Sequence, residues 1–139
     1  MPAHPFQLRA RFRYSGDDNH LDVIGAEVFT DAGWTPLEIG NTSPGFLIFV
    51  YSFLICQHTY FHANCTENGL RLEHANAELD LVATDNWKID RVSVRIEARL
   101  RGGTADQAAV DYIRQRMRLC PVSVNLVEPP DYHIELEFS

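Results

Sequence analysis

The sequence contains three cysteines that could take part in chemistry: Cys56, Cys65 and Cys120. A thiolate is a nucleophile and a metal ligand, and two thiols that meet can form a disulfide. The sequence holds no CxxC pair, which argues against a zinc ribbon or a thioredoxin-type site. The odd number of cysteines and their wide spacing do not fit the disulfide framework of a small secreted protein either. The pattern therefore predicts free thiols whose surroundings decide whether they react.

The first and the last of these cysteines stand in different local contexts. Cys120 directly precedes Pro121, at the start of a short predicted helix that runs to Leu126. Unpaired N–H groups and the helix dipole at such a position favour a reactive thiolate, although Cys120 could simply fill a capping position. Cys56 lies midway along an apolar helix, where a free cysteine often serves as a small buried hydrophobe. The residues alone leave packing and chemistry open for Cys56.

A second pattern on the same predicted helix suggests metal binding. His58, His62 and Cys65 fall at positions i, i+4 and i+7, on one stripe of the helix. That spacing could present three ligands to a zinc ion. No acidic residue or further histidine is identifiable as a fourth ligand, so a polar stripe at the helix end is the favoured interpretation. We predict neither a metal site nor a cofactor.

The composition indicates one globular domain that comprises residues 1–139. Apolar residues make up 45% of the chain and charged residues 22%, which is enough to build a packed core. The net charge of -7 argues against binding to nucleic acids or to anionic membranes. The N-terminal residues lack the charged and apolar runs of a signal peptide. Together with the free thiols, this predicts a cytoplasmic protein.

Two predicted helices must position Cys56 and Cys120. Ser43 as the N-cap and Pro44 at the first helical position start the first of them, which runs from Gly45 to about Asn64. This helix is apolar on nearly every side, as the central buried helix of a domain is. Its longest apolar stretch, 46–56, is shorter than the roughly 20 residues that span a bilayer.

The remaining elements are strands and one more helix. This helix lies between the two that carry the cysteines. Thr104 is its predicted cap, and its apolar stripe ends near Cys120. A change of phase near Ala75 predicts a bulge, and Pro129-Pro130 predicts a loop. Apolar alternation predicts strands at Phe6–Tyr14, His20–Thr30, Leu37–Ile39, Leu70–Leu81, Val92–Leu100 and Tyr132–Phe138. The order of elements predicts an α+β fold.

Two stretches together resemble the OsmC/Ohr proteins, the osmotically inducible protein C and organic hydroperoxide resistance family. Residues 40–44 (GNTSP) and the apolar helix that carries Cys56 are similar to the family's segment (T/S)-(N/S)-P, helix, C. Residues 119–126 (LCPVSVNL) are similar to its second motif, C-P-V-S-x-x-L. The order of predicted elements agrees as well, so the resemblance covers almost the whole chain.

The resemblance implies a fold, an assembly and a reaction. The fold is OsmC-like, with sheets rich in antiparallel strands around a buried central helix, and two chains form an intertwined homodimer with a pocket at the interface. By position, Cys56 corresponds to the peroxidatic cysteine and Cys120 to the resolving one. The Cys56 thiolate would reduce an organic hydroperoxide to its alcohol and become a sulfenic acid, which Cys120 would convert to a disulfide. A dithiol reductant, lipoyl-type in the best-known members, would reduce the pair again.

The sequence departs from the family pattern at one position that matters for reactivity. Peroxidase members carry a glutamate just after the proline of the first motif, and it helps to hold an arginine over the reactive thiolate. Here Pro44 is followed by Gly45. Arg13, in the N-terminal part of the chain, is the candidate for the arginine, and a solvated strand face is the other interpretation of this residue. Arg118 lies near Cys120 in the sequence and could support its charge.

Two functions of different classes follow. The first is thiol-dependent reduction of organic hydroperoxides by Cys56 and Cys120, at a rate reduced by the missing glutamate. The alternative is a non-catalytic dimer of this fold that binds an apolar small molecule in the interface pocket. A buried thiol without a positive partner has a raised pKa, which favours the alternative. The presence of both cysteines in their motifs favours the first.

Overall fold

A computed structural model of the chain describes residues 3–126, 129 and 131–139. The second proline of the predicted Pro129-Pro130 loop lies outside the described residues. The elements in chain order are β1 (His4–Ser15), β2 (His20–Thr30), β3 (Gly33–Pro36), α1 (Gly45–Glu67), β4 (Arg71–Ala83), β5 (Ile89–Gly102), α2 (Gln107–Met117), α3 (Pro121–Val124) and β6 (Asp131–Phe138). The predicted α+β class is confirmed.

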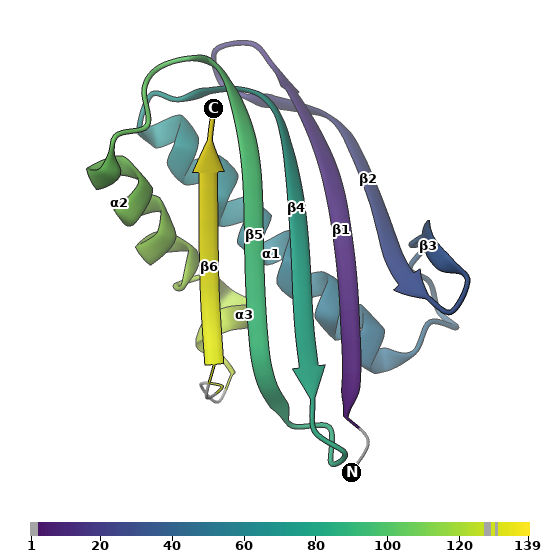
Figure 1. The fold of residues 1–139 in the computed structure, drawn as a ribbon. Helices are drawn as coiled ribbons and strands as arrows, with labels where there is room; N and C mark the ends of the chain where they lie inside the picture. Colours follow the sequence, from purple (N-terminus) through teal and green to yellow (C-terminus); the bar gives the residue numbers. More distant parts are fainter. Residues whose placement is uncertain (1–2, 127–128, 130) are drawn as a thin grey trace.

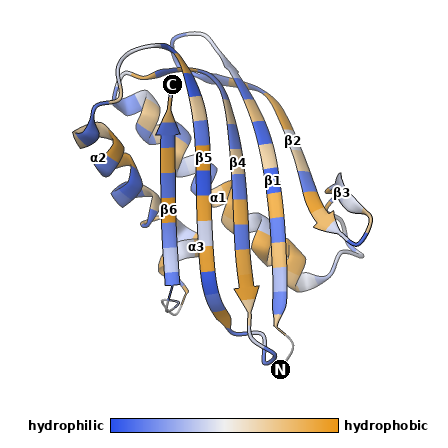
Figure 2. Ribbon diagram, viewed as in Figure 1, coloured by the Kyte–Doolittle hydropathy of each residue, from blue (hydrophilic) through white to orange (hydrophobic). Residues whose placement is uncertain are grey.

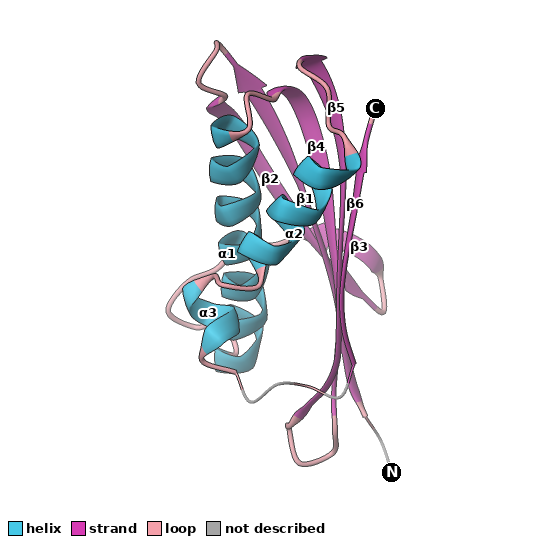
Figure 3. Ribbon diagram, turned by 90° about the vertical axis from the view of Figure 1, so that its left-hand side faces the viewer, coloured by secondary structure: helices cyan, strands magenta, loops and turns pink. Residues whose placement is uncertain are grey.

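The strands form one mixed sheet of six strands in the order β3-β2-β1-β4-β5-β6. All neighbouring strands are antiparallel except β5 and β6, which run parallel. The chain crosses from β5 to β6 through α2 and α3, as a parallel pair requires. The three helices lie on the same face of the sheet, with α1 running diagonally across it (Figures 1 and 3).

The alternation of side chains along β1 separates the two faces of this sheet. Leu8, Ala10, Phe12 and Tyr14 are buried and face α1, while the arginines between them belong to the opposite face. Figure 2 shows the same alternation of hydropathy along β4 and β5. Burial of this set and of its counterparts on β4 and β5 forms the core, and the hydrophobic effect of that burial holds α1 on the sheet.

α1 is long and apolar enough to cross a membrane by length and composition alone, because it extends to Glu67 over 23 residues. The predicted end near Asn64 was therefore too early, and the length argument against a membrane span does not hold for the whole helix. The packing of α1 against the sheet shows whether it is a core helix. Val50, Phe53 and Phe61 are fully buried against the sheet, so that α1 is the core helix of the domain.

A buried asparagine ties the turn after β1 to the end of α1. Asn19 has a left-handed backbone, with φ of 54°, which asparagine tolerates better than most residues. Its side-chain amide donates hydrogen bonds to the Leu70 carbonyl at 2.8 Å and to Thr66 Oγ1 at 3.0 Å. Its Oδ1 accepts one from the Leu72 N–H at 2.7 Å. These bonds anchor the half of α1 that follows Cys56.

The predicted start signals of the helices and one strand need correction. Ser43 does not cap α1, because its Oγ accepts a hydrogen bond from the Gly40 N–H at 3.0 Å, and the helix begins at Gly45 after Pro44. Asp106, and not Thr104, caps α2, since its Oδ1 accepts from the Ala109 N–H at 2.8 Å.

The third strand lies before the segment where it was predicted. Residues 37–39 are not a strand, and β3 is instead Gly33–Pro36, paired with β2 through a two-residue turn. Trp34 stabilises this hairpin by an edge contact with Phe29 at 5.4 Å and by stacking under the Arg9 guanidinium at 4.2 Å. The bulge predicted near Ala75 lies slightly earlier in β4, where the register shifts between Leu72 and His74.

Candidate redox site at two cysteines

Cys120 lies at the point where the chain leaves α2 and enters α3. It is the N-cap of α3, as the Cys-Pro sequence predicted, and its Sγ accepts a hydrogen bond from the Ser123 N–H at 3.3 Å. Its side chain is fully buried. A thiol at this position can satisfy an N–H group that has no partner inside the helix.

Cys56 lies on α1 beside this turn, with its side chain half-buried. The side chain of Cys120 and the backbone N–H of Val122 lie near enough to its thiol to change its pKa. Burial, followed by the nearby Cys120, raises the pKa of Cys56 to about 11, and the Val122 N–H opposes this rise. Both cysteines are free thiols. The structure thus brings together two thiols that are distant in the sequence.

Gln57 is a buried polar residue at this site that sequence reasoning missed. Its side-chain Nε2 donates hydrogen bonds to the Met117 carbonyl at 2.9 Å and to Cys120 Sγ at 3.1 Å. Its Oε1 has no hydrogen-bond partner among the described residues. The sequence did contain a signal for this residue, a single amide next to Cys56 in an otherwise apolar segment. A buried amide requires a hydrogen-bond partner, so a contact with another element could have been predicted.

β6 closes the site with an aromatic ring. The hydroxyl of Tyr132 is hydrogen-bonded to Ser123 Oγ at 3.1 Å, and its ring packs 5.9 Å from that of Phe53. Arg118 places its guanidinium 4.6 Å from the centre of the Tyr132 ring and donates to the Tyr132 carbonyl at 3.3 Å. Burial raises the pKa of Tyr132, and the charges of both cysteines add to that rise. The tyrosine is therefore a neutral wall of the site.

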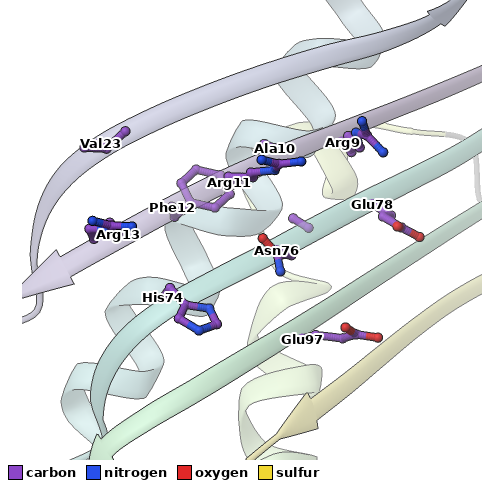
Figure 4. Close-up of a pocket in the computed structure, with 11 residues that line it drawn as sticks. Arg9, Ala10, Arg11, Phe12, Arg13, Val23, His74, Asn76, Glu78 and Glu97 are labelled. Atoms are coloured by element: carbon purple, nitrogen blue, oxygen red, sulfur yellow. The ribbon is translucent and has the colours of Figure 1, made fainter. Parts of the chain in front are cut away.

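Arg13 is not brought to the two cysteines within one chain. It is exposed on β1 between Val23 of β2 and His74 of β4. Because Phe12 and Tyr14 on either side of it face α1, Arg13 belongs to the opposite face of the sheet. Figure 4 shows it there, at a hollow of about 720 Å³ lined by Arg9, Ala10, Arg11, Phe12, Arg13, Val23, His74, Asn76, Ala77, Glu78 and Glu97. The solvated strand face is the interpretation that the geometry supports.

The histidines considered as metal ligands are engaged elsewhere. The Tyr14 hydroxyl is hydrogen-bonded to His58 Nε2 at 2.6 Å, and the His58 ring stacks on Phe12 with 3.5 Å between centres. Burial, followed by the nearby His62, lowers the pKa of His58 to about 3. His62 bonds to the Asn19 carbonyl at 2.5 Å. Among residues 3–126, 129 and 131–139, no group of three His, Cys, Asp or Glu side chains is arranged to hold a metal ion.

The chain is similar to known proteins in structure but matches none of them in sequence. No protein-family model matches the chain, and no curated protein sequence matches it. An OsmC-like hydroperoxide resistance protein from Jannaschia sp. is similar in structure, with a TM-score of 0.59, 11% identity, and coverage of 89% of this chain and 87% of the other.

Two further solved structures agree. An OsmC-like protein from Mycoplasma pneumoniae has a TM-score of 0.53 and 8% identity, with 100% of this chain and 96% of the other covered. An OsmC-like protein of unknown function from Vibrio cholerae has a TM-score of 0.52 and 11% identity, with 98% and 99% covered. The chain therefore has the OsmC-like fold, with little sequence identity to these proteins.

Proposed function

We propose that this protein reduces organic hydroperoxides through the thiols of Cys56 and Cys120. The observation that carries the proposal is that the two side chains, one from α1 and one from the start of α3, lie near enough for Cys120 to raise the pKa of Cys56. Two neighbouring thiols can form a disulfide where the backbone lets their sulfur atoms meet. The similarity to a structure described as an OsmC-like hydroperoxide resistance protein supports the same chemistry.

The reaction balances with the groups that are present and one added reductant. The Cys56 sulfur attacks the terminal oxygen of the hydroperoxide, an S–O bond forms, the O–O bond breaks, and the alkoxide leaves as an alcohol after taking a proton. Cys120 then attacks the sulfur of the resulting sulfenic acid, so that an S–S bond forms and water leaves. An external dithiol reduces the disulfide by exchange and is itself oxidised.

Two exposed apolar residues lie close to Cys120 in the sequence. Leu119 is 51% exposed and Val124 is 57% exposed, and these residues flank the cysteine on both sides in the sequence. Exposed apolar groups of this size favour contact with an organic molecule or a protein surface over water. An organic hydroperoxide is therefore the preferred class of substrate over hydrogen peroxide, and a dithiol with an apolar chain, such as a lipoyl group, is the preferred class of reductant.

The thiol count gives a direct test of the reaction. Reduced protein treated with one equivalent of cumene hydroperoxide is expected to lose two of its three thiols, and a dithiol should restore both. Cys65 is the matched internal control, because it is fully buried and its burial raises its pKa. If all three thiols persist while the hydroperoxide is intact, the proposed reaction is wrong.

A specific observation favours the alternative, a non-catalytic module that binds an apolar small molecule. The pKa of about 11 for Cys56 leaves its thiol protonated at neutral pH, and Gly45 stands where the family carries a glutamate. A protein of this kind would bind a hydroperoxide or a similar molecule without consuming thiols. The thiol count distinguishes the two functions, because binding alone leaves all the thiols free.

The outward face of α1 supports a homodimer as the working form, and the composition and free thiols favour the cytoplasm as its compartment. Opposite its core face, α1 carries a stripe of small and apolar residues at helical spacing: Gly45, Ile48, Ser52, Ile55, Thr59 and Ala63. None of them is buried in the single chain, and Ile48 is 37% exposed. Such a stripe suits contact with the same helix of a second copy. Cys56 adjoins this stripe, so the contact would enclose the site.

Substitution within the stripe is expected to separate the two chains. Ile48→Arg places a charge in the proposed contact, and sedimentation equilibrium should then give the mass of one chain where the unchanged protein gives the mass of two. Gln7→Arg, at an exposed position of β1 on the opposite face of the sheet, is the matched control and should remain dimeric. An unchanged protein that sediments as a monomer would contradict the proposed assembly.

A further inference from the structure

The face of the sheet that points away from the helices carries a row of arginines on β1. Arg9, Arg11 and Arg13 alternate with the buried side chains of this strand, so all three emerge on the same face. Neighbouring members of the row are about 7 Å apart along the strand. The helices that carry the two cysteines lie on the opposite face (Figure 3). The proposed peroxidase reaction therefore does not use this row.

The charge of Arg9 is compensated within the chain. In the register of the sheet it faces Glu27 of β2 and Glu78 of β4. Its guanidinium donates a hydrogen bond to Glu27 at 2.9 Å and lies 4.2 Å from the centre of the Trp34 ring. Opposite charges at facing positions of neighbouring strands stabilise a sheet, and Arg9 follows this rule.

Arg11 has no acidic residue opposite it on either neighbouring strand. Its partners in register are Gly25 of β2 and Asn76 of β4. A Cβ atom added at Gly25 would meet no atom within 4 Å, so there is open space beside Arg11. The side-chain amide of Asn76 can donate a hydrogen bond to a molecule that occupies this space.

Arg13 also lacks an acidic residue opposite it. Its partners in register are Val23 of β2 and His74 of β4. Arg11 and Arg13 are both exposed, and in the described part of the chain neither takes part in an ion pair or a side-chain hydrogen bond. Other arginines do pair with an acid: Arg9, Arg71, Arg95, Arg99 and Arg114.

These two uncompensated charges contrast with the composition of the chain. Acidic residues outnumber lysine and arginine by 19 to 12, and the net charge is -7. The positions that face Arg11 and Arg13 are nevertheless all without an acid. Two like charges at this separation repel each other. A bound anion would remove the repulsion and would supply the partner that the chain does not.

The two arginines line the hollow of about 720 Å³ on this face. Figure 4 shows Arg13 and His74 at one end of the hollow, with Arg11 and Asn76 next to them. The volume lies within the range of about 300–1,000 Å³ that is typical of small-molecule sites. The hollow thus combines space, two free guanidinium groups and two further polar side chains.

We propose that Arg11 and Arg13 bind a small molecule that carries a phosphate monoester group. Such a group has a charge of about -1.5 to -2 at neutral pH and three acceptor oxygens, which matches two guanidinium groups. Each guanidinium can donate two parallel hydrogen bonds to a pair of these oxygens. A carboxylate has a single charge and would leave one of the two arginines uncompensated. The site is independent of Cys56, Cys120 and their proposed reaction.

The other side of the hollow limits the size of the anion. Glu78 and Glu97 line it there, and their carboxylates repel a chain of phosphates that extends beyond the two arginines. The net charge of -7 adds to this repulsion for nucleic acids and anionic membranes. The site therefore suits one compact phosphate group on a small molecule.

Isothermal titration calorimetry of the unchanged protein with phenyl phosphate, in a phosphate-free buffer of low ionic strength, tests the site. We expect one molecule to bind per chain in the millimolar range, and benzoate to bind more weakly. Arg11→Gln and Arg13→Gln should each lower the affinity by about threefold to tenfold. Arg91→Gln is the matched control, because Arg91 is exposed on the same face of β5, outside the hollow, and its loss changes the net charge equally.

Asn76→Asp tests the site without the loss of an arginine. The new carboxylate would lie opposite Arg11, where it should pair with the guanidinium and repel the phosphate. The affinity should fall at least as far as in Arg11→Gln. Gln7→Glu introduces the same charge at an exposed position of β1 outside the hollow and should retain the affinity.

Three results would overturn the proposed site: no binding of phenyl phosphate to the unchanged protein, equal binding of benzoate, or an equal loss of affinity in Arg91→Gln. A single-stranded oligonucleotide that binds more tightly than phenyl phosphate would overturn the restriction to a small molecule. Substitutions at exposed positions such as these seldom unfold a domain, so the affinities can be compared directly.

Discussion

Replacement of Cys56 by serine is expected to lower hydroperoxide reduction by at least about a thousandfold, because the hydroxyl of serine is a far weaker nucleophile than a thiol here. Cys56 is the sulfur of the pair that solvent reaches. No other thiol can replace it, since Cys65 is fully buried on the other side of α1. Consumption of cumene hydroperoxide with an excess of dithiol measures the rate.

Replacement of Cys120 should have a different effect from replacement of Cys56. In Cys120→Ser the Cys56 sulfur can still be oxidised, but its sulfenic acid has no partner. A sulfenic-acid reagent such as dimedone should then label Cys56, and turnover should stop after one oxidation. Cys65→Ala is the control that should retain the rate of the unchanged protein. An active Cys56→Ser variant would contradict the assigned roles.

Acid is expected to destabilise the fold through His58. The ring is buried between Phe12 and the Tyr14 hydroxyl, and its pKa in the folded protein is lowered to about 3 from an ordinary value of 6.5. Below pH 6.5 the unfolded chain binds a proton at this residue that the folded protein does not bind. The free energy of unfolding should therefore fall by about 1.4 kcal/mol per pH unit as the pH drops from about 6.5 toward 3.

The groups that face His58 do not reverse this trend. Tyr14 stays neutral because burial raises its pKa, and His62, on the next turn of α1, lowers the pKa of His58 further when it is charged. A domain of ordinary stability, about 5–15 kcal/mol, would lose about 3 kcal/mol of it by pH 4.5. Urea denaturation at pH 7 and at pH 4.5 measures the loss.

The matched variant for this prediction is His58→Gln, which keeps an acceptor for the Tyr14 hydroxyl but does not titrate. It should be less stable than the unchanged protein at pH 7, because it gives up the stacking on Phe12 at 3.5 Å. Its stability should fall less between pH 7 and pH 4.5. An equal fall in both proteins would show that His58 is not the group responsible.

The sequence allowed the prediction of the elements that carry the two cysteines, because local signals are strong there. The apolar segment around Cys56 is a helix, and Cys120 before Pro121 opens another. Hydrophobic alternation also predicted β1 and, with it, the solvated strand face as one interpretation of Arg13. Since Phe12 and Tyr14 face the core, the arginine between them must face away from α1.

The contacts between distant segments could not be predicted in the same way. Gln57 bonds to a carbonyl 60 positions away in the chain, and no local pattern encodes that meeting. The sequence predicted Thr104 as the cap of α2, whereas the structure has Asp106 there. Both residues have suitable side chains, and only the path of the chain after β5 decides between them. The resemblance to the family suggested which thiols pair. Because Gly45 stands where the family carries a glutamate, the sequence does not indicate which residues would lower the pKa of either thiol.

Mass mapping of the oxidised protein shows whether Cys56 and Cys120 form the redox pair. After hydroperoxide treatment, alkylation and tryptic digestion without reduction, we predict a disulfide between the peptides 14–71 and 119–139. Because the first peptide contains both Cys56 and Cys65, the link must persist in Cys65→Ala and vanish in Cys56→Ser. A link that survives in Cys56→Ser, or the absence of any link after the hydroperoxide has been consumed, would contradict the account.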